Sequence, residues 1–89
     1  MDKAEIALQA LRECDSLKQQ HPRCPALNYV AVQMRYLLEL LNGEPSDKSR
    51  LKDVNVGLIA LREFDTRFPE FADQLMTVAK IVDDLRYAR

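Results

Sequence analysis

The sequence predicts an all-α fold, a single-domain helical bundle of about four helices that spans residues 1–89. The chain has only 2 Gly and 4 Pro and is rich in Leu, Ala, Glu, Lys and Arg, which favour helix over sheet. Its apolar residues recur at helical spacing. A chain of 89 residues provides one core, because short chains bury a smaller share of their surface.

The first two helices are predicted over about residues 4–20 and 26–42. One face of the first helix collects small and apolar side chains at helical spacing, namely Ala4, Ala7, Leu8, Leu11 and Cys14. The segment from His21 to Pro25 separates the two helices, because proline removes a donor and disfavours helix at the residue before it. The second helix ends at Gly43, a residue type suited to a left-handed C-terminal cap.

The third helix is predicted from an N-cap at Ser46 or Asp47 to about Asp65. Gly57 lies in its middle and costs roughly 1 kcal/mol against alanine, which predicts a close helix crossing or a close approach of a partner. The fourth helix begins at Pro69, because proline is favoured at the first helical position. Its apolar stripe consists of Phe71, Leu75, Val78, Val82 and Leu85.

The second and third helices are apolar on two faces. The main stripe of the second helix is Leu27, Val30, Met34, Leu37, Leu38 and Leu41, and the opposite one is Tyr29, Val32, Tyr36 and Leu40. The two stripes of the third are Leu51, Val54, Leu58 and Leu61, and Val56, Ala60 and Phe64. Either these helices are central and the first and fourth cover them, or part of a second stripe docks on a partner, with tyrosines as large contacts.

Patterns for catalysis, cofactors and metals are absent from the sequence. His21 is the only histidine, so no base pairs with a serine or cysteine as in a triad. Cys14 and Cys24 lack the spacing of a zinc site, and the two glycines lie too far apart for a phosphate-binding loop. We therefore expect no enzyme, no cofactor and no metal.

Charge and hydropathy predict a cytoplasmic protein that binds neither nucleic acid nor a membrane. The formal net charge is -1 and the pI is about 5.8, which predicts no binding to nucleic acid or to an anionic membrane. The N-terminus lacks a signal-peptide pattern, and no apolar run approaches the roughly 20 residues of a membrane span. A disulfide between Cys14 and Cys24 is not expected, since the cytosol keeps thiols reduced.

The residue order between Gln33 and Glu70 is similar to that of a known family. The matching positions are Gln33, Tyr36, Leu37, Asp47, Lys48, Ser49, Leu51, Gly57, Ile59, Ala60, Arg62, Glu63, Phe64, Asp65, Pro69 and Glu70, without gaps. They resemble the helical immunity proteins that protect bacteria from type VI secretion effectors, typified by the partner of an NAD(P)+ glycohydrolase toxin. The resemblance extends from about Ala7 to Asp84. It implies an all-helical cytoplasmic protein that binds the toxin domain of a cognate effector and blocks its active site.

An inhibitor of this kind needs aromatic anchors and charged groups on a rigid surface. A cleft that holds a phosphate-rich dinucleotide is expected to be basic, so acidic side chains of the inhibitor would match it. The candidate partner-binding residues are Tyr36, Glu39, Glu63, Phe64 and Asp65. Capping of the following loop is the alternative role for Asp65. The alternative function is a homodimeric helical scaffold or adaptor, in which the second stripes pack on another copy.

Overall fold

Four helical segments make up the part of the chain that the computed structural model describes, residues 2–43 and 48–87. The α-helices α1, α2 and α4 span Lys3–Gln20, Pro25–Leu41 and Pro69–Tyr87. The third segment is composite: a 3-10 helix η1 (Lys48–Asp53), a short α-helix α3 (Val56–Ile59) and a π-helical stretch η2 (Ala60–Phe64). The described residues contain no strand, and the predicted all-α fold class is confirmed.

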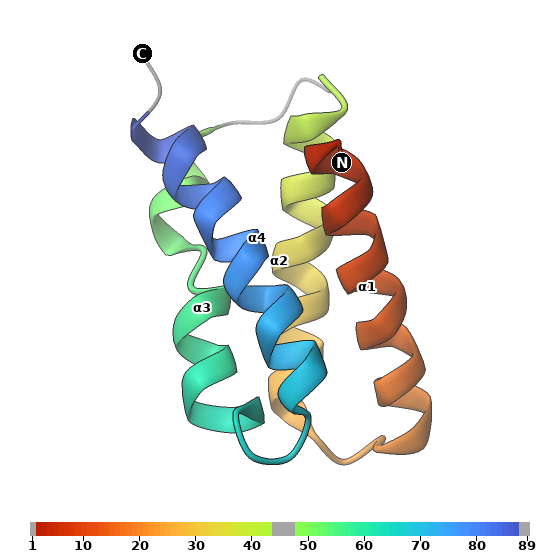
Figure 1. Cartoon of the computed structure of the whole chain (residues 1–89). Helices are drawn as coiled ribbons and strands as arrows, with labels where there is room; N and C mark the ends of the chain where they lie inside the picture. The colour runs from red at the N-terminus through yellow and green to blue at the C-terminus, as the bar shows by residue number, and fades with distance from the viewer. Residues whose placement is uncertain (1, 44–47, 88–89) are drawn as a thin grey trace.

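The segments run up and down in a bundle (Figure 1). In this view α4 lies between α1 and α3, with α2 behind it. Helix α4 packs on α1, on α3 with η2, and on η1, whereas α2 packs on α1 and α3. The third segment is not covered on all sides, because its Leu58 and Leu61 side chains are 52% and 59% exposed. The alternative in which the other helices cover both of its stripes is therefore wrong for this segment.

Gly43 and Pro69 set helix ends as the sequence predicts, whereas Pro25, which the sequence places in the separating segment, is the first residue of α2. Pro25 opens α2 and Pro69 opens α4, where a missing N–H costs nothing. Gly43 follows the end of α2 with φ 76°, and its N–H donates to the Leu40 carbonyl at 3.2 Å. This left-handed conformation is the predicted cap. The predicted N-caps Ser46 and Asp47 lie outside the described residues.

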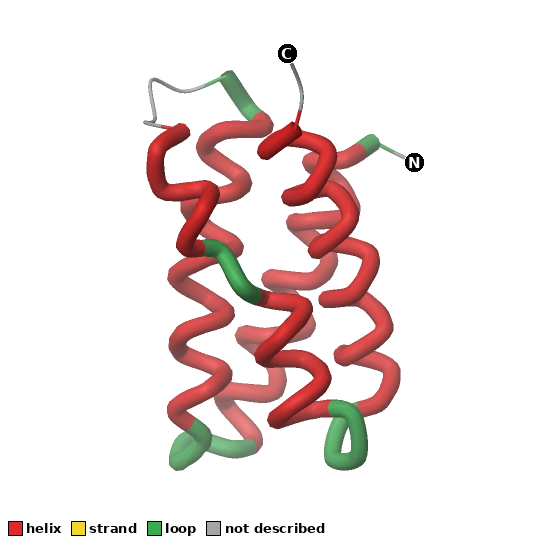
Figure 2. The backbone as a smooth tube through the Cα atoms, turned by 90° about the vertical axis from the view of Figure 1, so that its left-hand side faces the viewer, coloured by secondary structure: helices red, strands yellow, loops and turns green. Residues whose placement is uncertain are grey.

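The third helical segment is broken, where the sequence predicts one continuous helix. Figure 2 shows the break as a loop in the middle of this segment. Val54 and Val56, on the two sides of the break, are both buried. In one regular helix two residues at this spacing lie about 200° apart and cannot share a face. Breaking the helix at Asn55 lets each half turn its own stripe to the core, and it leaves Leu58 and Leu61 exposed.

The core is apolar throughout the described residues, with no buried charged side chain. At the end of the bundle where η2 turns into α4, Phe64 lies between Phe68 and Phe71, with ring centroids 5.8 and 5.3 Å away. On α1, the Cys14 thiol donates to the Leu27 carbonyl at 3.2 Å, and burial raises the pKa of Cys14 to about 11. The Cys14 side chain therefore stays a neutral thiol at physiological pH.

Gly57 marks the close crossing of α3 and α4. A Cβ atom built on Gly57 would lie 3.0 Å from the Ala79 Cβ and 3.8 Å from the Met76 Sδ. The closer of these atoms is attached directly to the α4 backbone, so it cannot move aside as the end of a long side chain would. The predicted close crossing at Gly57 is confirmed, and it holds α3 tightly against α4.

Replacement of Gly57 by valine is expected to lower the free energy of unfolding by about 1–3 kcal/mol, because the added atoms force the two helices apart. Urea unfolding followed by circular dichroism measures this loss. The matched background is Ala79→Gly, which removes the opposing Cβ. If the crossing is the cause, Gly57→Val costs less in that background; an equal cost in both backgrounds would contradict the steric explanation.

Candidate partner-binding site

Two apolar side chains of α2 face solvent. Tyr29 is 65% exposed and Val32 is 56% exposed, one helical turn apart. The main stripe of α2 is in or against the core, so these residues form part of the second stripe that the sequence shows. Single exposed apolar residues are ordinary, but an adjacent pair beside a groove is typical of an interaction surface.

A groove of about 420 Å³ lies beside this pair, between α2 and η1. We call it the α2–η1 groove, and it is lined by Tyr29, Val32, Gln33, Tyr36, Arg50, Asp53 and Val54. The Arg50 guanidinium lies 5.1 Å from the centroid of the Tyr36 ring, within the range of a cation–π contact. The groove thus combines an apolar wall from α2 with one cation and one carboxylate from η1.

A pair of amide hydrogen bonds fixes the groove at the break between η1 and α3. The Gln33 Nε2 donates to the Asn55 Oδ1 at 2.7 Å, and the Asn55 backbone N–H donates to the Gln33 Oε1 at 2.9 Å. The break removes the helical partner of this N–H, and the Gln33 side chain replaces it. The same contact ties the broken segment to α2 and sets the position of η1 above Tyr36.

Of the predicted site residues, Tyr36 and Glu39 lie on α2. Tyr36 is 8% exposed and forms part of the groove lining beneath Arg50, so its ring offers a partner little surface. Glu39 is exposed one turn further along α2, two residues before the helix ends. These two residues and the exposed pair Tyr29 and Val32 follow one line along α2, at helical spacing.

The other three predicted residues lie at the opposite end of the bundle. Glu63 and Asp65 are exposed where η2 ends, whereas Phe64 between them is fully buried. A side chain with no exposed surface cannot touch a partner that docks on this conformation. The structure therefore places Phe64 in the core, apart from the two carboxylates.

The structure also separates Glu39 from Glu63. The Gln33–Asn55 pair brings α2 and α3 to one level, and the two segments then run in opposite directions from it (Figure 1). At about 1.5 Å per residue, Glu39 lies roughly 9 Å above this level and Glu63 roughly 12 Å below it. The two carboxylates therefore lie toward opposite ends of the bundle and cannot enter one narrow cleft together.

Sequence reasoning assigned Tyr29 and Val32 to a second stripe but left them out of the site. Their position on that stripe was the available signal; their exposure depends on which neighbours cover them. Arg50 and Asp53 were missed altogether, because nothing in the local sequence shows that η1 folds over α2. Leu58 and Leu61 form a second exposed pair, on α3 and η2, at 52% and 59% exposure.

Within residues 2–43 and 48–87, no helix combines the length and the apolar character that crossing a lipid bilayer requires. In the same residues, no three side chains of His, Cys, Asp or Glu are grouped in an arrangement that could hold a metal ion.

Comparison with known proteins identifies the family. A family model described as Tsi6 matches residues 3–84, which is nearly the whole chain. No curated protein and no solved structure matches the chain. The matched range contains α1, α2, the broken third segment and most of α4, and therefore the entire α2–η1 groove. The chain belongs to the Tsi6 family of type VI secretion immunity proteins.

Proposed function

We propose that this protein binds the toxin domain of a cognate type VI effector in the cytoplasm and occludes its active site. The proposed toxin is an NAD(P)+ glycohydrolase or a related nucleotide-targeting enzyme. Support comes from the family, which consists of immunity proteins, and from the resemblance of residues 33–70 to the partner of such a toxin. The protein needs no chemistry of its own for this task, since steric exclusion of substrate inhibits the toxin.

The observation that carries this proposal is the exposed apolar pair on α2 beside the α2–η1 groove. Tyr29 and Val32 offer a flat contact, and Arg50 and Asp53 supply charges at the opposite wall. Interfaces of inhibitors gain most of their affinity from a few anchors of this type, surrounded by polar groups. The proposed docking face is therefore the α2–η1 side, with Glu39 at one end and Glu63 and Asp65 at the other.

Co-expression tests the function directly. The toxin domain encoded beside this protein is expressed in a sensitive bacterium with and without this chain, and growth and cellular NAD(P)+ are measured. We expect the toxin domain alone to stop growth and deplete the dinucleotides, and the chain to restore both. Growth arrest despite abundant soluble chain would contradict the proposed function.

Charge reversal tests the acidic ends of the face. We expect Glu39→Lys, Glu63→Lys and Asp65→Lys to abolish protection in combination, because the face then carries lysines at both of its ends, and whichever end meets the basic substrate cleft is repelled by like charge. Affinity for the toxin domain and helical content by circular dichroism are the measurements. The matched control reverses three exposed carboxylates elsewhere, Glu13, Asp73 and Asp84, with the same change in net charge. Protection that survives the first set would remove these residues from the site.

A homodimeric scaffold is the second candidate function, and the exposed pair Leu58 and Leu61 favours it. Two such pairs from two copies would cover each other in a symmetric contact. Light scattering over a range of concentrations tests this candidate. A monomer at all concentrations would leave the immunity function as the sole proposal.

A further inference from the structure

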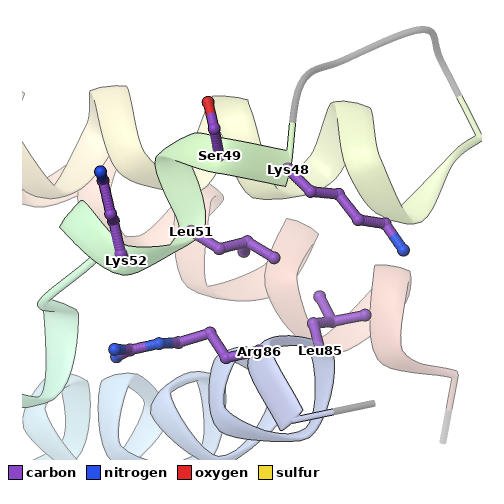
Figure 3. A pocket seen from close by; sticks show the side chains of 6 residues that line it. All are labelled: Lys48, Ser49, Leu51, Lys52, Leu85 and Arg86. Carbon is purple, nitrogen blue, oxygen red and sulfur yellow. The ribbon is translucent and has the colours of Figure 1, made fainter. Parts of the chain in front are cut away.

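A trough of about 300 Å³ lies between η1 and the last turns of α4, on the other side of η1 from the α2–η1 groove. We call it the η1–α4 trough, and it is lined by Lys48, Ser49, Leu51, Lys52, Leu85 and Arg86 (Figure 3). Leu51 and Leu85 extend toward each other and form its apolar centre. Lys48 extends toward one end; at the other end Arg86 extends along α4, and the Lys52 side chain points away from Arg86, toward the far side of η1.

The lining of this trough is cationic, although the whole chain has a net charge of -1. Three of its six lining residues are cations and none is acidic. Among the described side chains, no carboxylate lies within ion-pair distance of Lys48, Lys52 or Arg86. Asp83, one turn before Arg86, lines a neighbouring groove along α3, and Arg86 lines both that groove and the trough. The Arg86 guanidinium lies 5.9 Å from the centroid of the Tyr87 ring, a contact that does not neutralise its charge, so the trough keeps a net positive charge.

The short helix η1 divides its cations between its two sides. Arg50 lies over the Tyr36 ring and belongs to the α2–η1 groove, while Lys48 and Lys52 belong to the trough. The two sites thus share one wall. A partner docked on the α2–η1 groove needs to reach only across η1 to place a segment in the trough.

The directions of the cations decide between two classes of ligand. A phosphate is held by several donors that converge on one anion. Here Lys48 points away from Lys52 and Arg86, and the leucines lie between them. This arrangement matches an extended peptide, which advances about 3.3–3.6 Å per residue and can place acidic side chains at both ends of an apolar one.

We propose that the η1–α4 trough binds an acidic segment of the cognate effector, with carboxylates near Lys48 and near Lys52 and Arg86 and an apolar side chain on Leu51 and Leu85. This inference rests on the proposed function, because it adds a second contact to the same partner. Exposed charges of this kind raise the rate of association more than they prolong the complex. The trough therefore captures the effector, and the α2–η1 groove retains it.

Association kinetics with the purified toxin-bearing effector test the trough. The variant is Lys48→Glu with Lys52→Glu and Arg86→Glu; the matched control reverses Lys3, Arg12 and Lys80, which are exposed elsewhere and change the net charge equally. At low salt we expect the trough variant to associate at least about tenfold more slowly than the control and to lose most of its salt dependence. Equal association rates for the two variants would overturn the inference.

Two further measurements separate this inference from the proposed function. A labelled peptide Glu-Glu-Leu-Glu-Glu should bind the unmodified chain and not the trough variant; no binding, or equal binding of pyrophosphate, would overturn the peptide assignment. A Tyr29→Asp, Val32→Asp variant should associate at near the normal rate but dissociate quickly. If it loses the effector while the trough variant behaves as its control, the trough inference alone fails. If the unmodified chain does not bind the effector, the proposed function fails, and with it the trough's assigned partner.

Discussion

Replacement of Tyr29 and Val32 together by aspartate is expected to abolish protection against the toxin and to weaken toxin binding at least about 100-fold, close to 3 kcal/mol. Both side chains are largely exposed, so the fold loses little when they change. In the complex they would be covered, and an unpaired carboxylate buried at an interface is costly. Calorimetry of binding and growth of the toxin-expressing strain measure the two effects.

The chain contains a matched control for this experiment. Leu58 and Leu61 are also exposed and three residues apart, but they lie on α3 and η2. Their replacement by aspartate is expected to weaken toxin binding much less than the α2 variant does, because Leu61 lies only near the Asp65 end of the face, and to prevent any self-association through that surface. If the leucine variant loses protection and the α2 variant keeps it, the docking face lies on α3, and the assignment to α2 is wrong.

Replacement of Phe64 by alanine is expected to lower the free energy of unfolding by about 3–5 kcal/mol. Phe64 is fully buried and packs on Phe68 and Phe71, so its removal leaves a cavity where η2 turns into α4. Small domains have about 5–15 kcal/mol of total stability, so this loss unfolds a substantial share of the molecules at growth temperature. Urea unfolding measures the change, and Phe64→Leu, which keeps most of the volume, is the milder control.

The same variant separates a core role for Phe64 from a contact role. If Phe64 acts only in the core, the folded fraction of Phe64→Ala at low temperature should bind the toxin domain with nearly normal affinity. Protection in cells would then fail in proportion to the loss of folded protein. Weak binding by a variant that is fully folded would contradict the core assignment and return Phe64 to the contact surface.

Local sequence was sufficient for the helix ends. Pro25 and Pro69 open helices, and Gly43 ends one, because each acts through its own backbone conformation and needs no distant partner. The close approach at Gly57 could also be predicted, since a glycine inside a helix suggests a neighbour close to its missing side chain. The Ala79 Cβ is that neighbour, although only the structure identifies it.

The binding-site residues were harder to predict from the sequence than the helices were. Tyr36 and Glu39 were correctly placed on one helix, but the exposure of each depends on a distant segment. Tyr36 is covered because η1 lies over α2 and brings Arg50 onto its ring. The periodicity of α2 alone treats Tyr36, Tyr29 and Val32 as equivalent members of one stripe, so it could not tell the covered residue from the two uncovered ones.

By itself, the sequence determined the class of the fold, the places where three of the four helical segments begin or end, and the resemblance that the family match confirms. These depend on local backbone preferences and on residue order. Only the tertiary structure decided where the third segment breaks, which stripe each half buries, and which apolar side chains remain outside. The physical reason is that Val54 and Val56 cannot both be buried in one regular helix. The break is possible because the Gln33 side chain accepts a hydrogen bond from the Asn55 N–H, which has lost its helical partner.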